Sequence, residues 1–176
     1  MRMFTALKLP ERFADDVSAL ARRLEAVVEG RFVPREARHL TLAFLGDVPE
    51  ANALVAADAL EAACAGVPRI PLRAAGLGAF GRKDDATLWL GIARSPELEH
   101  LAARLREELA ARELSFDGKP FKPHVTLARR ARIPRGDLPP LPFPLADQAE
   151  TATLFKSTLR RDGAVYEPLR SVRLVG

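Results

Sequence analysis

Apolar residues in this chain follow the two-residue repeat of strands in some segments and the three- to four-residue repeat of helices in others. Residues 2–8 alternate as a strand does. From Phe13 to Val27 the apolar positions recur at three- and four-residue steps, which predicts an amphipathic helix. Pro10 suits the first turn of that helix, and we expect Gly30 to end it. The chain therefore opens with a predicted strand and helix.

The rest of the chain continues this alternation. Residues 39–45 form a predicted strand that Gly46 closes, and the Ala-rich stretch 50–64 is a predicted helix. Two strands follow at 69–80 and 86–93, joined by the polar turn GRKDD. The remaining predicted elements are a helix that begins at Pro96 with a buried stripe from Leu98 to Leu109, the proline-rich loop IPRGDLPPLPFPLAD, and a closing hairpin of 151–160 and 165–175.

Landmarks of the first half return in the second half at a nearly constant distance. Pro96 lies 86 residues after Pro10, and His124 lies 85 residues after His39. A constant offset indicates an internally duplicated unit. Such a unit often packs as two lobes about an approximate two-fold axis, which would bring His39 and His124 into one cleft from opposite sides.

We therefore treat the chain as a single domain, residues 1–176, with approximate halves 1–85 and 86–176. Its composition is ordinary for a globular protein, with 48% hydrophobic and 28% charged residues. No apolar run approaches the ~20 residues of a membrane span, and the N-terminal segment resembles a first strand more than a signal peptide. One cysteine, Cys64, forms no internal disulfide and is expected to be buried, so we expect a cytoplasmic protein.

The phrases HLTL and HVTL carry the candidate chemistry. They begin at His39 and His124, two of only three histidines in the chain. Because side chains alternate along a strand, each histidine shares a face with the threonine two residues later, Thr41 or Thr126. Each strand then buries its aliphatic face and presents an imidazole beside a hydroxyl on the other.

Two imidazoles at one site suit paired proton transfer. The ordinary histidine pKa, ~6.5, lies close to neutrality, so one ring can accept a proton while the other donates one. Threonine hydroxyls are neutral donors that can hold the oxygens of a phosphate. The net charge of +4 is compatible with a phosphate-bearing partner but is weak support alone. Two imidazoles and two threonine hydroxyls suit a displacement reaction at phosphorus that needs no metal.

Other interpretations of these residues are weaker. A lone histidine on a strand is usually structural, but two copies in register with a duplication favour function. Zinc needs three or four ligands, and no closely spaced histidine pair or second cysteine accompanies the motifs. The third histidine, His100, falls on the water-facing side of its helix. No Gly-x-Ser-x-Gly occurs, and GLGAFG lacks the Lys-Ser/Thr of a phosphate loop.

The two motifs resemble the signature tetrapeptides of the 2H phosphoesterases. The stretches MRMFTALKLP, KPFKPHVTLAR and STLRRDGAVYEPL make the whole chain similar to the RNA 2′,3′-cyclic phosphodiesterases, also called 2′–5′ RNA ligases. The resemblance implies an α+β fold of two pseudo-symmetric lobes, each an antiparallel sheet with helices on its outer face, and an active-site cleft between them. It implies hydrolysis of a terminal 2′,3′-cyclic phosphate on RNA to a 2′-phosphate, with reversible 2′–5′ ligation as a related reaction.

The resemblance also implies roles for the motif residues. His39 corresponds to the general acid that protonates the 3′-oxygen, and His124 to the general base that activates water. Because the site is pseudo-symmetric, the two roles can exchange. Thr41 and Thr126 would hold the phosphate.

The cation and the base contact are less sharply defined. The family pattern points to Arg129, five residues after His124, whereas strict alternation places Arg130 on the histidine face; a bulge would reconcile the two. At the matching position of the first motif stands Phe44, which either stacks on the terminal base or joins the core. Lys119 and Lys122 either draw RNA to the cleft or are solvated surface residues.

The expected partner is RNA with a 2′,3′-cyclic phosphate end, and the protein is expected to act as a monomer without a cofactor, a metal or a membrane. Two alternatives differ in class from this enzyme or in its substrate. The protein could bind RNA ends without turnover, or it could be a phosphodiesterase of the same fold that acts on another cyclic phosphate or on a 2′–5′ oligonucleotide.

Overall fold

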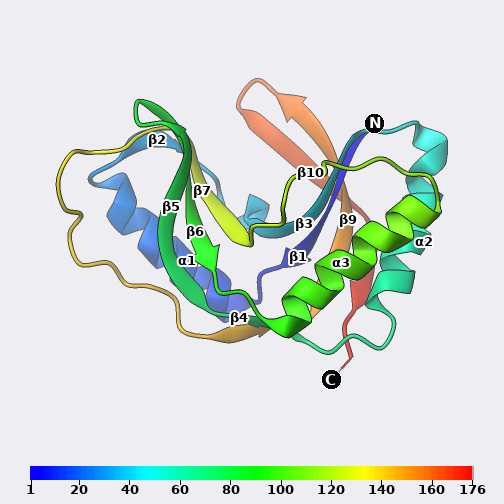
Figure 1. The fold of residues 1–176 in the computed structure, drawn as a ribbon. Helices are drawn as coiled ribbons and strands as arrows, with labels where there is room; N and C mark the ends of the chain where they lie inside the picture. The colour runs from blue at the N-terminus through cyan, green and yellow to red at the C-terminus, as the bar shows by residue number, and fades with distance from the viewer. Residues whose placement is uncertain (176) are drawn as a thin grey trace.

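This computed structural model describes residues 1–175, which contain ten strands and three α-helices (Figure 1). The helices are α1 (Glu11–Glu25), α2 (Ala53–Cys64) and α3 (Pro96–Ala111). The strands are β1 (Arg2–Lys8), β2 (Glu29–Phe32), β3 (His39–Asp47), β4 (Ile70–Leu72), β5 (Ala74–Arg82), β6 (Asp85–Ile92), β7 (His124–Arg132), β8 (Asp147–Ala149), β9 (Thr151–Arg160) and β10 (Gly163–Arg173).

Eight of the strands form one antiparallel sheet. Its order is β10-β9-β1-β3-β7-β6-β5, with β2 paired to β7, while β4 and β8 form a separate pair. Within it, β3 and β7 meet only at Leu40 and Val125. On either side of this junction the strands diverge into two lobes (Figure 1). The predicted α+β fold with antiparallel sheets is therefore confirmed, and the sheets of its lobes join at a single residue pair.

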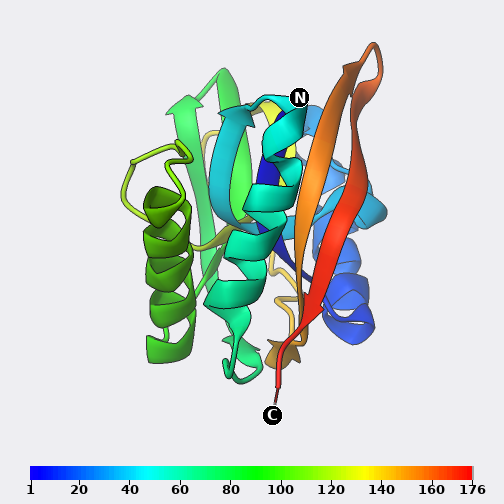
Figure 2. The ribbon, with the colours of Figure 1, turned by 90° about the vertical axis from the view of Figure 1, so that its right-hand side faces the viewer.

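Two of the three α-helices, α1 and α3, do not stay with the β1–β3 or β6–β7 strands of their own half of the chain. α2 packs on β9, β10 and α3, and α3 packs on β3, so both cover the lobe that begins with β1. They stand side by side in Figure 2. α1 lies against β2 in the other lobe. The strand order reads β1-β3 on one side of the junction and β6-β7 on the other, as a duplicated unit would give, and the duplication itself stays a prediction.

The predicted apolar stripe of α1 is buried, but the end of the helix differs from the prediction. Val27 is 43% exposed because the helix ends at Glu25. Gly30 was expected to end α1, and that prediction is wrong, because Gly30 lies within β2. A Cβ atom at Gly30 would lie 3.0 Å from Ala131 Cα, so a residue without a side chain lets β2 approach β7. None of the helices in residues 1–175 is long and apolar enough to cross a membrane.

The second half of the fold agrees with the pattern except at one predicted strand. The single strand predicted at 69–80 is broken at Arg73 into β4 and β5. The closing hairpin is present as β9 and β10, and Cys64 and His100 are buried and exposed as expected. The proline-rich segment has no helix or strand before β8.

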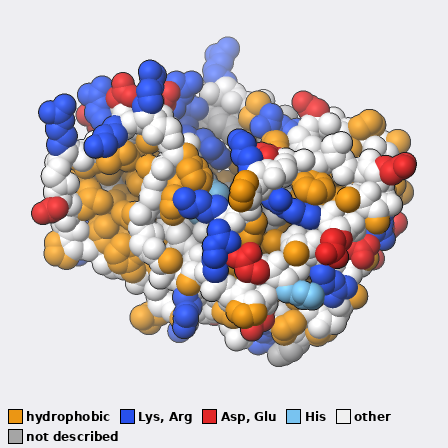
Figure 3. Space-filling model, in the orientation of Figure 1, with side chains coloured by type: hydrophobic (Ala, Val, Ile, Leu, Met, Phe, Trp, Pro, Cys, Tyr) orange, Lys and Arg blue, Asp and Glu red, His pale blue; other side chains and the backbone are white. Residues whose placement is uncertain are grey.

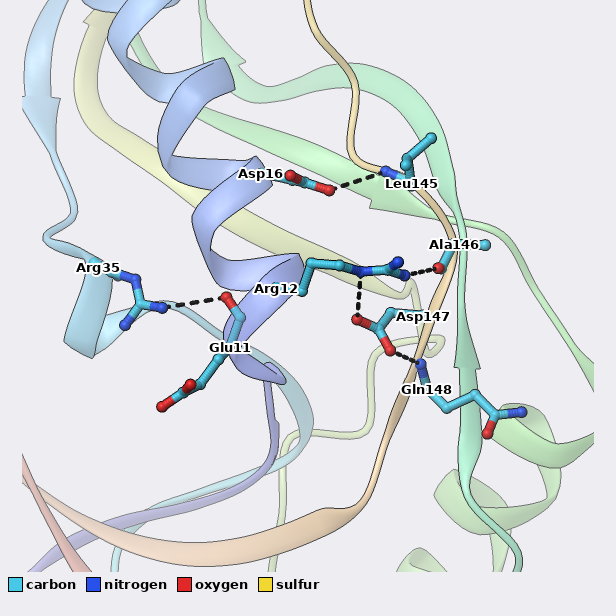
Figure 4. A network of polar contacts seen from close by, with 8 residues as sticks. All are labelled: Glu11, Arg12, Asp16, Arg35, Leu145, Ala146, Asp147 and Gln148. Atoms are coloured by element: carbon cyan, nitrogen blue, oxygen red, sulfur yellow. Dashed lines mark hydrogen bonds and ion pairs between the residues drawn. The ribbon is translucent and has the colours of Figure 1, made fainter.

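Polar contacts fasten that proline-rich segment to α1 (Figure 4). The Arg12 guanidinium donates to the Ala146 carbonyl at 2.7 Å, and its Nε lies 3.5 Å from a carboxylate oxygen of Asp147. The Leu145 amide donates to Asp16 at 3.3 Å. The segment thus crosses the outside of the lobe that contains β7, away from the junction of the lobes.

Candidate active site

The junction of the two lobes sets the direction of the motif side chains. Leu40 and Val125 are direct partners across β3 and β7, and both are fully buried. Partners in an antiparallel ladder point to the same face of the sheet, so the residues on either side of this pair point to the opposite face. The core therefore lies on one face of the junction and the motif residues lie on the other.

Four motif residues share that second face. Continuing the register by one residue in each direction sets His39 across from Thr126 and Thr41 across from His124. All four are half-buried. The Leu40–Val125 pair therefore brings the two motifs together in the structure, with their histidines and threonines on one face.

Both imidazoles are held in the same way. The Nδ1 of His39 donates to the Ala37 carbonyl at 2.9 Å, and the Nδ1 of His124 donates to the Lys122 carbonyl at 2.6 Å. With Nδ1 protonated, Nε2 of each neutral ring carries a lone pair. The Thr41 hydroxyl donates to His39 Nε2 across 3.0 Å. Each ring is thereby oriented with its Nε2 atom free of the backbone.

Aromatic rings enclose both imidazoles. Phe4 stacks on His39 with 4.7 Å between ring centroids, and Tyr166 meets it edge-on at 5.4 Å. Phe80 meets His124 edge-on at 5.2 Å, and Trp89 lies at 5.8 Å. These neighbours exclude water from the rings and leave the positive form of each poorly solvated.

This enclosure lowers the pKa of both histidines. Burial lowers the pKa of His39 to about 4, with the charges of Arg129 and His124 acting in the same direction and the bond to Ala37 opposing them. Burial also lowers the pKa of His124, and Lys122 and Arg129 contribute to that shift. Both rings are therefore neutral near pH 7 when no anion lies between them.

Bulges reset the alternation of side chains just after each motif. Two consecutive residues are buried in β3, Leu42 and Ala43, and two in β7, Leu127 and Ala128. The pairing register shifts at the same places, opposite Thr5–Ala6 in β1 and Leu88–Trp89 in β6. A bulge adds one residue to the strand. The residues after it therefore point to the opposite face from the one that strict alternation predicts.

The bulges decide where the candidate cation and the candidate stacking residue lie. Both arginines are exposed, but Arg129 lines a pocket together with His39 and Thr41, whereas Arg130 has φ of +49° and does not line that pocket. Phe44 also lines it and is only half-buried. The structure therefore orients Arg129 and Phe44 toward the cleft; their contacts with phosphate and base stay predictions.

Two adjoining pockets meet at this site. The first contains His39 and Arg129, the second contains His124, and Thr41 and Phe44 line both. Lys119 and Lys122 line the second pocket, where Lys122 Nζ lies 4.9 Å from the Trp89 ring centroid. Thr126, although it faces the same side as His124, lines neither of the two.

Several residues of these pockets were absent from the sequence-based prediction. Arg2, Phe4, Ser157 and Tyr166 line the first pocket. Alternation in residues 2–8 does set Arg2 and Phe4 on one face, but only the pairing of β1 with β3 brings that face to His39. Within residues 1–175, no three His, Cys, Asp or Glu side chains gather as a metal site would require.

Comparisons with known proteins agree with the geometry. The family model described as the 2′-5′ RNA ligase superfamily matches residues 9–137. The RNA 2′,3′-cyclic phosphodiesterase of Thermus thermophilus is 35% identical, covering 100% of this chain and 91% of the relative. The crystal structure of TT0787 from Thermus thermophilus superposes with a TM-score of 0.85 at 29% identity, covering 100% and 99% of the two chains. The Escherichia coli LigT complexed with 3′-AMP has a TM-score of 0.78 at 30% identity, over 99% and 98%.

Proposed function

Since this chain belongs to the 2′-5′ RNA ligase superfamily, we propose that it is an RNA 2′,3′-cyclic phosphodiesterase that works through a pair of histidines. Relatives matching along the full chain carry that activity in their names. The observation that supports the mechanism is the opposed arrangement of His39 and His124, each with Nδ1 bonded to a backbone carbonyl and Nε2 free of the backbone.

In the proposed reaction the cyclic phosphate lies between the two Nε2 atoms. His124 accepts a proton from water as the water oxygen forms a bond to phosphorus. The bond between phosphorus and the 3′-oxygen breaks in line with the attack, and His39 gives its proton to that oxygen. The product is a 2′-phosphate with a free 3′-hydroxyl, and the proton held by His124 then returns to solvent.

The lowered pKa of His39 bears on this assignment. An acid whose pKa is about 4 holds little proton at pH 7. The negative charge of the cyclic phosphate favours the charged imidazole, so substrate binding should raise the pKa of His39 and load it with a proton. Removal of the nearby water by substrate makes this electrostatic effect stronger.

The remaining site residues would hold the substrate. We assign Arg129 to the non-bridging phosphate oxygens, because its guanidinium can donate two parallel bonds to them. Thr41 and Thr126 supply neutral hydroxyl donors, and Phe44 supplies a face for the terminal base. Arg130 has no such role in this proposal. Because the two imidazoles provide both proton transfers, the reaction needs no metal, and a 5′-hydroxyl of RNA in place of water would give 2′–5′ ligation.

The test is turnover of a 2′,3′-cyclic nucleotide in excess EDTA, with the product identified by ³¹P NMR. We expect full activity and only the 2′-phosphate. Loss of activity in EDTA would contradict the metal-free mechanism, and a 3′-phosphate would reverse the leaving group. Tight binding without turnover would favour the non-catalytic alternative. Turnover only of another cyclic phosphate or a 2′–5′ oligonucleotide would change the substrate.

A further inference from the structure

Two arginines face each other across β2 and β7 with no acidic residue between them. Arg31 on the edge strand is the direct partner of Arg129, the arginine that lines the pocket of His39. Direct partners in an antiparallel pair point to the same face, so the two guanidinium groups share one side of the sheet. Like charges directly opposite each other destabilise a sheet. Arg130, beside Arg129, adds a third positive charge at this edge.

No carboxylate relieves this repulsion. Among the side chains of residues 1–175, none forms an ion pair or a hydrogen bond with Arg31, Arg129 or Arg130, although ten ion pairs occur elsewhere. Arg132, in contrast, has Glu29 as its strand partner. We call Arg31, Arg129 and Arg130 the arginine edge.

Basic residues on the β9–β10 hairpin are compensated. On the β9–β10 hairpin, Lys156 is the direct partner of Glu167, and Arg161 stands next to Asp162 in the turn. Lys and Arg side chains also gather along the edge of the lobe that contains β2 and β7 (Figure 3). Arg2 also lines the His39 pocket without an ion pair among residues 1–175, but it lies 5.0 Å from the Phe44 ring centroid, whereas Arg31 and Arg129 are two unrelieved charges directly opposite each other.

We propose that the arginine edge binds the phosphodiester backbone of RNA immediately 5′ of the cyclic end, so that the strand leaves the active site over β2 and β7. This rests on the proposed function, because it takes the cyclic end to lie at the histidines. Arg129 serves the terminal phosphate, and Arg31 meets the next phosphate along the strand. Phosphate contacts of this type position a nucleic acid without reading its sequence.

Protection of the exposed edge strand against pairing with other chains is a weaker explanation for Arg31. Charged side chains on an exposed edge prevent pairing with other chains. Any charge at Arg31 would serve that purpose, and a glutamate there would also remove the repulsion with Arg129. A positive charge on both strands is the arrangement that an anionic ligand requires.

The experiment compares wild type, Arg31→Gln and Arg161→Gln, which removes one equally exposed positive charge from the hairpin. Affinity is measured by fluorescence anisotropy for an oligoribonucleotide with a 2′-phosphate end and by competition for the 2′-mononucleotide, across salt concentrations. For Arg31→Gln we expect the ratio of oligonucleotide to mononucleotide affinity to fall roughly 3- to 10-fold, and the salt slope to decrease by about 0.7, as for one lost single-strand phosphate contact. Arg161→Gln should retain the wild-type ratio.

A thermal readout separates binding from structure. Without RNA and at low salt, Arg31→Gln should raise Tm by about 1–3 °C, because one of two opposed charges is gone, and high salt should remove that gain. An unchanged affinity ratio in Arg31→Gln, or a ratio that falls in Arg161→Gln instead, would overturn the proposal. Because these readouts need no turnover, an inactive protein would count against the proposed function and leave the inference to be judged by binding.

Discussion

At the scale of single residues, the burial of His39 links its charge to its surroundings. Phe4 and Tyr166 enclose the ring, and its pKa falls to about 4 in the folded protein against ~6.5 for an unfolded chain. The unfolded chain therefore binds the proton more readily. The stability gained by keeping His39 neutral is complete above pH ~6.5 and is lost progressively as the pH falls toward 4.

Replacing His39 should make the protein less sensitive to acid. His39→Gln keeps a polar side chain but removes the titration, so the loss of unfolding free energy between pH 7 and pH 4.5 should shrink by about 1–3 kcal/mol relative to wild type. Urea denaturation at the two pH values measures this difference.

His100 provides the matched control for that comparison. Its side chain is exposed on α3, whereas aromatic rings enclose His39. His100→Gln should retain the wild-type pH dependence. Equal pH dependence in His39→Gln and wild type would show that the ring is not held neutral by burial.

At the scale of secondary-structure elements, the two bulges give β3 and β7 the same profile after each histidine. In both strands a buried Leu-Ala pair is followed by a residue that faces the cleft, Phe44 in one and Arg129 in the other. A second irregularity of β7 lies at Arg129 and Arg130, opposite Ala86–Leu88, and there Arg130 has a φ of +49°, which is strained for a residue with a side chain. Arg130 is thus a positioning residue for Arg129.

Arg130 variants should separate conformation from charge. Arg130→Gly relieves the strain and keeps the bulge, so kcat/KM for a 2′,3′-cyclic mononucleotide should stay within about threefold of wild type. Arg130→Val resists positive φ and should displace Arg129, lowering kcat/KM at least tenfold, which corresponds to about 1.4 kcal/mol. If the glycine variant fell as far as the valine variant, the charge of Arg130 would matter and its backbone would not.

Most of the elements followed from periodicity, and the exceptions have physical causes. The stripes of α1 and α3 and the closing hairpin were predictable because local patterns determine them. Gly30 was misassigned because a glycine that ends a helix and one that admits a neighbouring strand are alike in sequence. The sequence left two options open after His124, strict alternation or a bulge. It could not decide between them, because the bulges form through pairing with β1 and β6.

At the scale of the whole molecule, the two histidines stand beside the contact between the lobes. The repeated motifs predicted a shared cleft. Two features could not be predicted, the packing of α1 and α3 on strands of the other half and the pocket residues from β1, β9 and β10. Both depend on strand pairings that no local pattern encodes. Leu40 and Val125 form the strand pairing between the lobes, directly behind the four motif residues.

Truncation at this junction should affect stability and catalysis together. Leu40→Ala should lower the unfolding free energy by about 2–5 kcal/mol and also lower kcat, because the lobes and their histidines lose a shared support. Leu105→Ala removes an equally buried leucine from α3 and should cost similar stability with little change in kcat. Equal effects on kcat from the two variants would argue against a special role for the junction.

The central claim is that His39 and His124 act as one pair on one phosphate. The most direct measurement is the single-turnover rate of His39→Ala, His124→Ala and the double variant on a 2′,3′-cyclic nucleotide, with folding verified by circular dichroism. The account predicts a loss of about 10²- to 10⁴-fold for each single variant. It also predicts a loss in the double variant smaller than the product of the two, because the residues act as a unit. A single variant that retains the wild-type rate would contradict it.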